Sequence, residues 1–132
     1  MWHPKMVEFD KRMKALFDEV DHYLEDLYGD KYPLHPSRPL RGETENPEMD
    51  GLFNISAVFT PGFNSEHGRG YIIDVSISTL EKVDENIRGE IYEAAAEKAK
   101  ELLPVHFPER ELTIQREKNH FKIQGDFSLG NA

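Results

Sequence analysis

The sequence predicts an α+β fold: a two-layer sandwich of order α-β-β-α-β-β, with two helices on one face of a four-stranded, mainly antiparallel sheet. Three observations predict it. Two segments carry apolar residues at helical spacing, four shorter ones alternate apolar and polar residues, and stretches rich in glycine or proline separate them. The chain has 132 residues, the length of one domain, so we expect a single domain over 1–132.

Residues 5–28 carry an apolar stripe at alternating steps of three and four, which is typical of an amphipathic helix. Pro4 precedes this segment and Gly29 follows it, at positions that helix starts and stops favour. The stripe consists of Met6, Phe9, Met13, Leu16, Val20, Tyr23 and Leu27. We expect the helix to pack on its own sheet. The alternative is self-association through the 6–28 helix.

Residues 30–52 show no period and contain four prolines, which predicts an irregular loop. The loop also carries apolar residues, so we expect an ordered segment that those side chains hold in place. Residues 53–60 and 70–79 alternate apolar and polar residues, which predicts a hairpin over 53–79.

The second helix is expected at 84–103, with Asp84 as its N-cap and Pro104 ending it. A second hairpin is expected over 110–127, with Asn119 taking a left-handed conformation in its turn. An antiparallel sheet can leave one face to solvent. The side chains predicted on that polar face are Asn54, Ser56, Asp74, Ser76, Ser78, Gln115, Lys122 and Gln124.

The composition excludes several classes of site and partner. The chain has no cysteine, so disulfides, thiolate metal sites and cysteine nucleophiles are absent. The formal net charge of −9 argues against a general binder of nucleic acid or anionic membranes. No apolar run is long enough to span a bilayer and no leader is visible at the start, so we expect a cytoplasmic protein without membrane contact.

Two irregular loops, 35–44 and 62–70, are the strongest candidate for a ligand site. Arginines bind carboxylate or phosphate groups through two nitrogens, and glycines let backbone donors approach an anion closely. If the loops converge, they form a pocket for a small anionic ligand. The candidate residues are His35, Arg38, Arg41 and Thr44 in the first loop, and Asn64, Ser65, His67 and Arg69 in the second. Alternatively, the arginines pair with nearby acids and hold the loops down.

Nucleophilic catalysis and metal binding are weaker candidates. Ser65, His67 and Asp74 contain the residue types of a triad, but no nucleophile-elbow motif surrounds the serine. A second group of possible ligands shares one face of the first helix but lacks the paired histidines of a zinc helix. It consists of Asp18, His22, Glu25 and Asp26. We expect this face to be solvated, with no metal and no cofactor.

Nucleic-acid contact through the 110–122 hairpin is a further alternative, because this hairpin carries several basic residues. The predicted polar face of the sheet lacks the exposed aromatic residues that stack on bases, which argues against nucleic acid as a partner.

The leading hypothesis is therefore a small binding or assembly module that self-associates. The alternative is a small enzyme or ligand-binding protein for an anionic metabolite. The sequence leaves open whether the protein is an enzyme.

Overall fold

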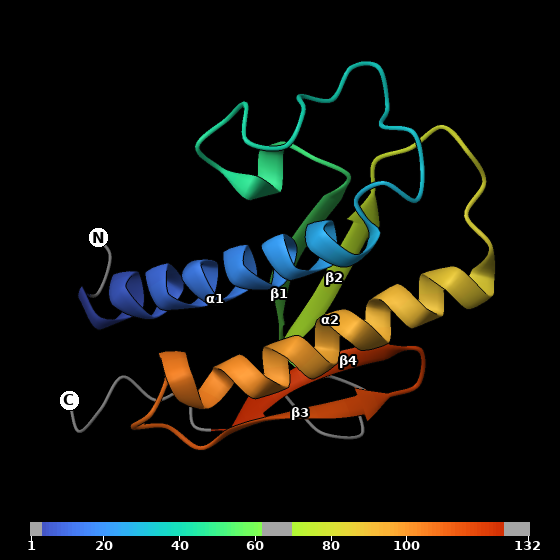
Figure 1. The fold of residues 1–132 in the computed structure, drawn as a ribbon. Coiled ribbons are helices and arrows are strands. Elements are labelled where there is room, and N and C mark those ends of the chain that lie inside the picture. Colours follow the sequence, from blue (N-terminus) through green and yellow to red (C-terminus); the bar gives the residue numbers. More distant parts are fainter. Residues whose placement is uncertain (1–3, 62–69, 126–132) are drawn as a thin grey trace.

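The structure is a computed structural model that describes residues 4–61 and 70–125 (Figure 1). Its elements follow the predicted order, so the α+β fold class is confirmed. They are α1 (Pro4–Tyr28), the short 3-10 helix η1 (Pro47–Met49), β1 (Phe53–Thr60), β2 (Gly70–Ile77), α2 (Glu85–His106), β3 (Leu112–Glu117) and β4 (His120–Gly125). Within these residues, no helix is both long and apolar enough to cross a bilayer.

The four strands form one antiparallel sheet in the order β1-β2-β4-β3. β1 and β2 pair along their whole length, as do β3 and β4. Within residues 4–61 and 70–125, strand pairing joins the two hairpins only where Tyr71 pairs with Ile123 and Ile72 with Lys122. Figure 1 shows the hairpins crossing at a steep angle. The centre of the sheet is therefore a short seam from which β2 and β4 diverge.

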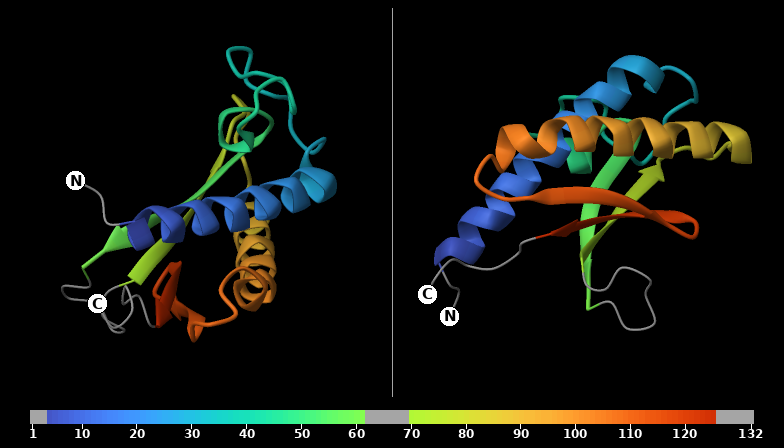
Figure 2. Two further views of the ribbon diagram at one scale, coloured as in Figure 1. Left: turned by 90° about the vertical axis from the view of Figure 1, so that its left-hand side faces the viewer. Right: turned by 90° about the horizontal axis from the view of Figure 1, so that it is seen from below.

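Both helices lie on one side of the sheet (Figure 2), and the core fills the space between the two layers. The apolar stripe of α1 supplies much of this core, as expected for a helix packed on its own sheet. The buried α1 side chains are Phe9, Met13, Leu16, Phe17, Val20 and Leu24. Burying one such side chain is worth about 1.5–3 kcal/mol. Most of the stripe is thus used inside the chain and is not available to a partner.

The predicted end of the second helix is wrong, because α2 continues through Pro104 to His106. Proline removes one backbone donor, but only the last turn lies beyond it. Tertiary contacts hold that turn: Arg12 donates from Nε to the His106 carbonyl at 2.8 Å, and the Phe107 N–H donates to the Leu103 carbonyl at 2.8 Å. The predicted N-cap is confirmed, since the Asp84 carboxylate accepts from the backbone of Asn86.

Smaller differences concern the strand ends and one turn. β2 ends at Ile77, two residues before the predicted end at 79, and the second hairpin spans 112–125 within the predicted 110–127. Residue 127 lies outside the described residues. In the turn between β3 and β4, Lys118 rather than Asn119 takes the left-handed conformation, with φ of 56°.

Lys122 lies on the predicted polar face, opposite Ile72 and Gln115, but it is not exposed to solvent there, because its side chain is buried with only 1% exposed. Its amine lies 2.9 Å from the Glu117 carboxylate, so the charge is paired. The stem of the lysine passes over Gly70, where an added Cβ would lie 2.9 Å from Cδ. Because Gly70 has no side chain, the stem of Lys122 can lie against the backbone there.

Candidate functional site

Arg38, a predicted anion ligand, binds backbone carbonyls instead. Its guanidinium donates to the carbonyls of Glu48, Asp50, Gly51 and Phe53 at 2.8–3.1 Å. These acceptors come from η1, the following turn and the first residue of β1. Arg38 therefore holds the 30–52 loop to the start of the sheet.

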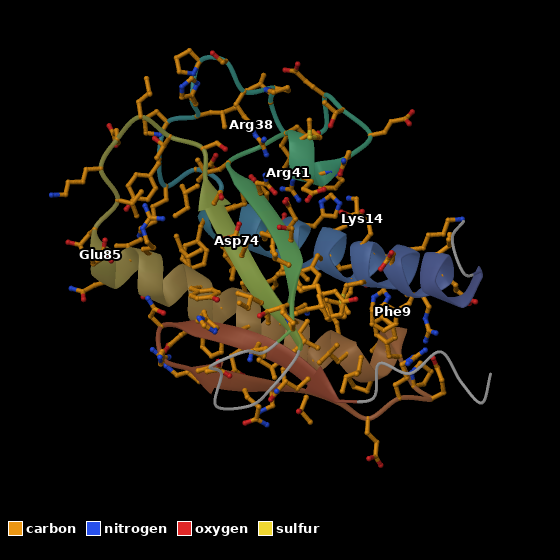
Figure 3. All side chains as sticks on the ribbon, turned by 180° about the vertical axis from the view of Figure 1, so that it is seen from behind. Phe9, Lys14, Arg38, Arg41, Asp74 and Glu85 are labelled. Atoms are coloured by element: carbon orange, nitrogen blue, oxygen red, sulfur yellow. The ribbon has the colours of Figure 1, made fainter. Side chains whose placement is uncertain are left out.

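The other predicted residues of the first loop also have partners within the chain. The carboxylate of Asp26 on α1 lies 2.9 Å from Arg41. Thr44 donates its hydroxyl to Asp50 at 2.7 Å, and the backbone N–H of His35 donates to the Ser78 carbonyl at 2.8 Å. Figure 3 shows Arg38 and Arg41 at the loop-bearing end of the molecule.

The apolar residues of this loop play a mixed part. Tyr32 and Leu34 pack against the core, and Leu52 is buried, but Leu40 and Met49 are exposed. The loop is ordered mainly by polar contacts, with the apolar residues clamping only its two ends.

Residues 62–69 of the predicted second loop lie outside the described residues, together with the candidates Asn64, Ser65, His67 and Arg69, and Gly70 is the first residue of β2. The flanking strand residues, Thr60 and Gly70, pair with each other at the far end of the hairpin from the 30–52 loop. A strand rises about 3.3 Å per residue, so eight-residue strands separate the two ends by roughly 23 Å. Asp74, the third member of the possible triad, is exposed on β2.

The acidic face of α1 is not uniformly solvated, which corrects the prediction. Asp21 is 3% exposed and Glu25 is buried, because the 30–52 loop folds back over this part of the helix. Glu25 accepts a hydrogen bond from the backbone N–H of Phe53 at 2.9 Å. Among the residues that the structure describes, no three acidic or histidine side chains are grouped so that they could hold a metal ion.

Asp21 and Asp50 illustrate opposite electrostatic effects at this helix–loop junction. Burial, then the neighbouring carboxylates of Glu25 and Asp50, raise the pKa of Asp21 to about 8. Burial also acts to raise the pKa of Asp50, but hydrogen bonds from Thr44 and the Gly42 backbone, with the charge of Arg38, together outweigh it and the pKa is lowered. The junction is therefore a structural cluster of carboxyl groups around Arg38.

The basic hairpin engages several of its charges internally. Arg116 lies 3.1 Å from Glu93 and stacks over the Phe121 ring. Arg110 lies over the Phe9 ring, and Lys122 is buried with Glu117. These contacts do not present a row of free cations to a phosphate backbone.

The sheet has two edge strands, β1 and β3, and of these two only β1 carries no charged residue. Phe53 directs its backbone away from β2, since its N–H donates to Glu25 and its carbonyl accepts from Arg38. Backbone direction alternates along a strand, so Ile55, Ala57 and Phe59 also point their N–H and C=O groups outward. Glu25 and Arg38 thus cap the start of this edge, and η1 packs beside its first half. Among the described residues, no group bonds to the outward N–H and C=O groups of Ile55, Ala57 and Phe59.

Beyond its capped start, the strand itself carries no residue that blocks an open edge. Exposed edges are commonly protected by charged residues, proline or bulges. Between Phe53 and Thr60 there is no charge and no proline, and Val58 and Phe59 are each 53% exposed. The absence of charge and proline from residues 53–60 is visible in the sequence and was a signal for an open strand edge.

Besides the outer edge of β1, the sheet has unpaired backbone groups where β2 and β4 diverge. The Tyr92 hydroxyl donates to the Ile73 carbonyl at 2.6 Å and accepts from the Phe121 N–H at 2.9 Å. These two backbone groups would bond to each other if the ladder continued past Ile72. A tyrosine of α2 therefore bridges the sheet at the point where it opens.

Comparisons with known proteins place the chain in a family. A family profile described as "Uncharacterised protein" matches residues 4–125. The chain is similar to an uncharacterized protein of Borreliella burgdorferi, with 38% identity over 123 residues that cover 93% of this chain and 96% of that protein. No solved structure matches. The chain belongs to this family of uncharacterised proteins.

Proposed function

We propose that the protein is a non-enzymatic assembly module that self-associates by pairing the β1 strands of two copies. The observation that carries this proposal is the open, uncharged outer edge of β1 from Ile55 to Phe59. Strand addition of this kind obtains affinity from backbone hydrogen bonds and specificity from alternating side chains. The interface differs from the 6–28 helix that the sequence suggested, because the helix stripe is largely buried.

The register of such a pairing is self-complementary. Two identical antiparallel strands related by a two-fold axis place Ala57 opposite Ala57 and Ile55 opposite Phe59. All three residues direct their backbone groups outward, so each opposed pair exchanges two hydrogen bonds. A one-residue shift would oppose residues whose backbone groups point to β2, which favours this register.

The side chains also suit a symmetric contact. The exposed ring of Phe59 already packs edge-on against Tyr71, with ring centroids 5.5 Å apart, so it is held in place before association. No charge in β1 would face its own copy, which avoids like-charge opposition at the interface. The dimer would continue the sheet across two chains.

Replacing Ala57 with proline tests this proposal. The Ala57 N–H points away from β2, so proline removes a donor from the proposed interface without removing one from the protein's own ladder. We expect the unchanged chain to sediment with twice the mass of one chain, and Ala57→Pro to sediment as a monomer with an unchanged far-ultraviolet circular dichroism spectrum.

Leu80→Lys is the matched control, since Leu80 is 72% exposed in the connection between β2 and α2. This variant should remain dimeric, because it removes an exposed apolar side chain outside β1. The proposal is wrong if the unchanged chain is a monomer at all concentrations, or if a folded Ala57→Pro variant still dimerises.

A further inference from the structure

A cleft of about 470 Å³ lies where β2 separates from β4. The second half of β2 forms one wall, the first turns of α2 form another, and the β3–β4 turn closes one end. Residues that line it include Val75, Ile77, Arg88, Gly89, Tyr92 and Phe121. Its volume falls within the range of ligand pockets in proteins.

One wall of this cleft is an unpaired strand edge. The Ile73 carbonyl points away from β1 to the Tyr92 hydroxyl, so by alternation the backbone groups of Val75 and Ile77 point to the same side. The β2–β4 ladder ends at Ile72, before these residues. The Ile77 carbonyl accepts from the Thr79 N–H, which leaves the Val75 N–H and C=O and the Ile77 N–H at the cleft.

Gly89 lies on the opposite wall of the cleft, on α2, and adds no side chain to it. Glycine inside a helix costs roughly 0.5–1 kcal/mol relative to alanine, and here no packing demand offsets that cost. A Cβ at Gly89 would meet no atom within 4 Å. The absent side chain leaves room in the cleft for another chain to approach the helix.

The charged residues of the cleft indicate which charges a ligand can carry. Arg88 is exposed at the cleft, and the described part of the chain gives its side chain no ion pair. An incoming carboxylate could bind its guanidinium through two nitrogens. The exposed Asp74 and Glu85 lie on the walls formed by β2 and the start of α2 (Figure 3), so a highly acidic segment would be repelled there.

We propose that this cleft binds an extended segment of a partner protein, which pairs with the free edge of β2 at Val75 and places one acidic side chain against Arg88. The exposed N–H and C=O groups along β2 require a partner with backbone groups at the same repeat, which a peptide has. Apolar side chains at alternate peptide positions would pack between Ile77 and Phe121.

A display library of random heptapeptides, selected on the immobilised full chain, tests the proposal. We expect enriched sequences to alternate apolar and polar residues and to share one acidic position. Gly89→Leu fills the cleft while improving helix propensity, so the variant should fold. It should bind synthetic copies of the enriched peptides at least about tenfold more weakly than the unchanged chain does.

Lys100→Leu is the matched control, because 11 residues are about three turns and place Lys100 on the same face of α2 as Gly89 but away from the cleft. It should bind the peptides as the unchanged chain does. In backbone amide exchange, the Val75 amide should exchange fast in the free chain and slow down with peptide. The absence of enriched sequences, equal binding to Gly89→Leu, or a Val75 amide already protected in the free chain would overturn the proposal.

This cleft is separate from the proposed dimer interface, because the two use opposite edges of the β1–β2 hairpin. Ala57→Pro should therefore retain peptide binding, and Gly89→Leu should retain the dimer. Loss of one activity in these variants without loss of the other distinguishes the two proposals.

Discussion

Asp21 shows how one buried carboxyl group links stability to pH. It is almost fully buried on α1, and one of its oxygens has no hydrogen-bond partner among the residues that the structure describes. Burial, with the carboxylates of Glu25, Asp50 and Asp18, raises its pKa to about 8, while Arg38 acts in the opposite direction. The folded state therefore binds a proton that the unfolded state has released above about pH 4.

We predict that Asp21→Asn becomes increasingly stabilising as pH rises. The contribution of Asp21 is fully present below about pH 4 and is lost as pH approaches 8, whereas asparagine stays neutral throughout. The free energy of unfolding of the variant relative to the unchanged chain should rise by about 2 kcal/mol or more between pH 4.5 and pH 8.5. Denaturant unfolding at several pH values measures it, and a difference that does not change with pH would contradict the assignment.

Gly51 and Gly42 form a matched pair for the contact between Glu25 and the loop. Both have positive φ, 71° and 87°, where a side chain is strained. A Cβ at Gly51 would lie 2.6 Å from the Glu25 carboxylate, and one at Gly42 would meet nothing. Gly42→Ala should cost about 1 kcal/mol of stability from strain alone, and Gly51→Ala should cost about 2–4 kcal/mol. Equal losses in denaturant unfolding would mean that the Glu25 contact contributes nothing.

The buried carboxyl groups could not be predicted from the sequence. The spacing of Asp21 and Glu25 places them on the polar side of an amphipathic helix, and that inference holds locally. They are buried because the 30–52 loop folds back over the helix, bringing the charge of Arg38 and the N–H of Phe53, which is 28 positions beyond Glu25. Nothing in the periodicity of α1 encodes this return.

The helices and strands could be predicted from the local spacing of apolar residues wherever one face of the element is buried. The α1 stripe and the alternation in β1 gave both identity and bounds, because burial demands apolar residues at the period of the helix or strand. The helix end predicted at Pro104 is wrong because the contact between Arg12 and His106 holds the turn that proline weakens. The opening between β2 and β4 had no local signal beyond a glycine inside α2.

Tyr92 tests how the two hairpins are joined. We predict that Tyr92→Phe leaves the Phe121 N–H without its acceptor and costs about 1–3 kcal/mol of stability. The Phe121 amide should exchange at least about tenfold faster. Tyr23→Phe on α1 is the control, since its ring contact with Lys98 survives the loss of the hydroxyl. Unchanged exchange at Phe121 would mean that the strands close directly on each other.

In the molecule as a whole, both proposed surfaces exist because strands of the sheet have backbone groups that no neighbouring strand pairs: β1 is an edge strand, and β2 pairs with β4 at only two of the described positions. The helices cover one face, the polar residues cover much of the other, and backbone groups without a pairing strand lie at the two sheet edges, β1 and β3, and in the β2–β4 cleft. Fold class was predictable from the chain because it depends on burial pattern. Strand order and the short central seam depend on long-range packing, so these surfaces required the structure.

Amide hydrogen exchange of the unchanged chain as a function of its concentration tests the central claim, that β1 is an assembly edge. The account predicts that the Ala57 and Phe59 amides exchange more slowly as concentration rises, while the Val75 amide, on the other side of the hairpin, stays fast. Exchange at Ala57 that is fast and independent of concentration, from dilute to near-millimolar chain, would contradict it.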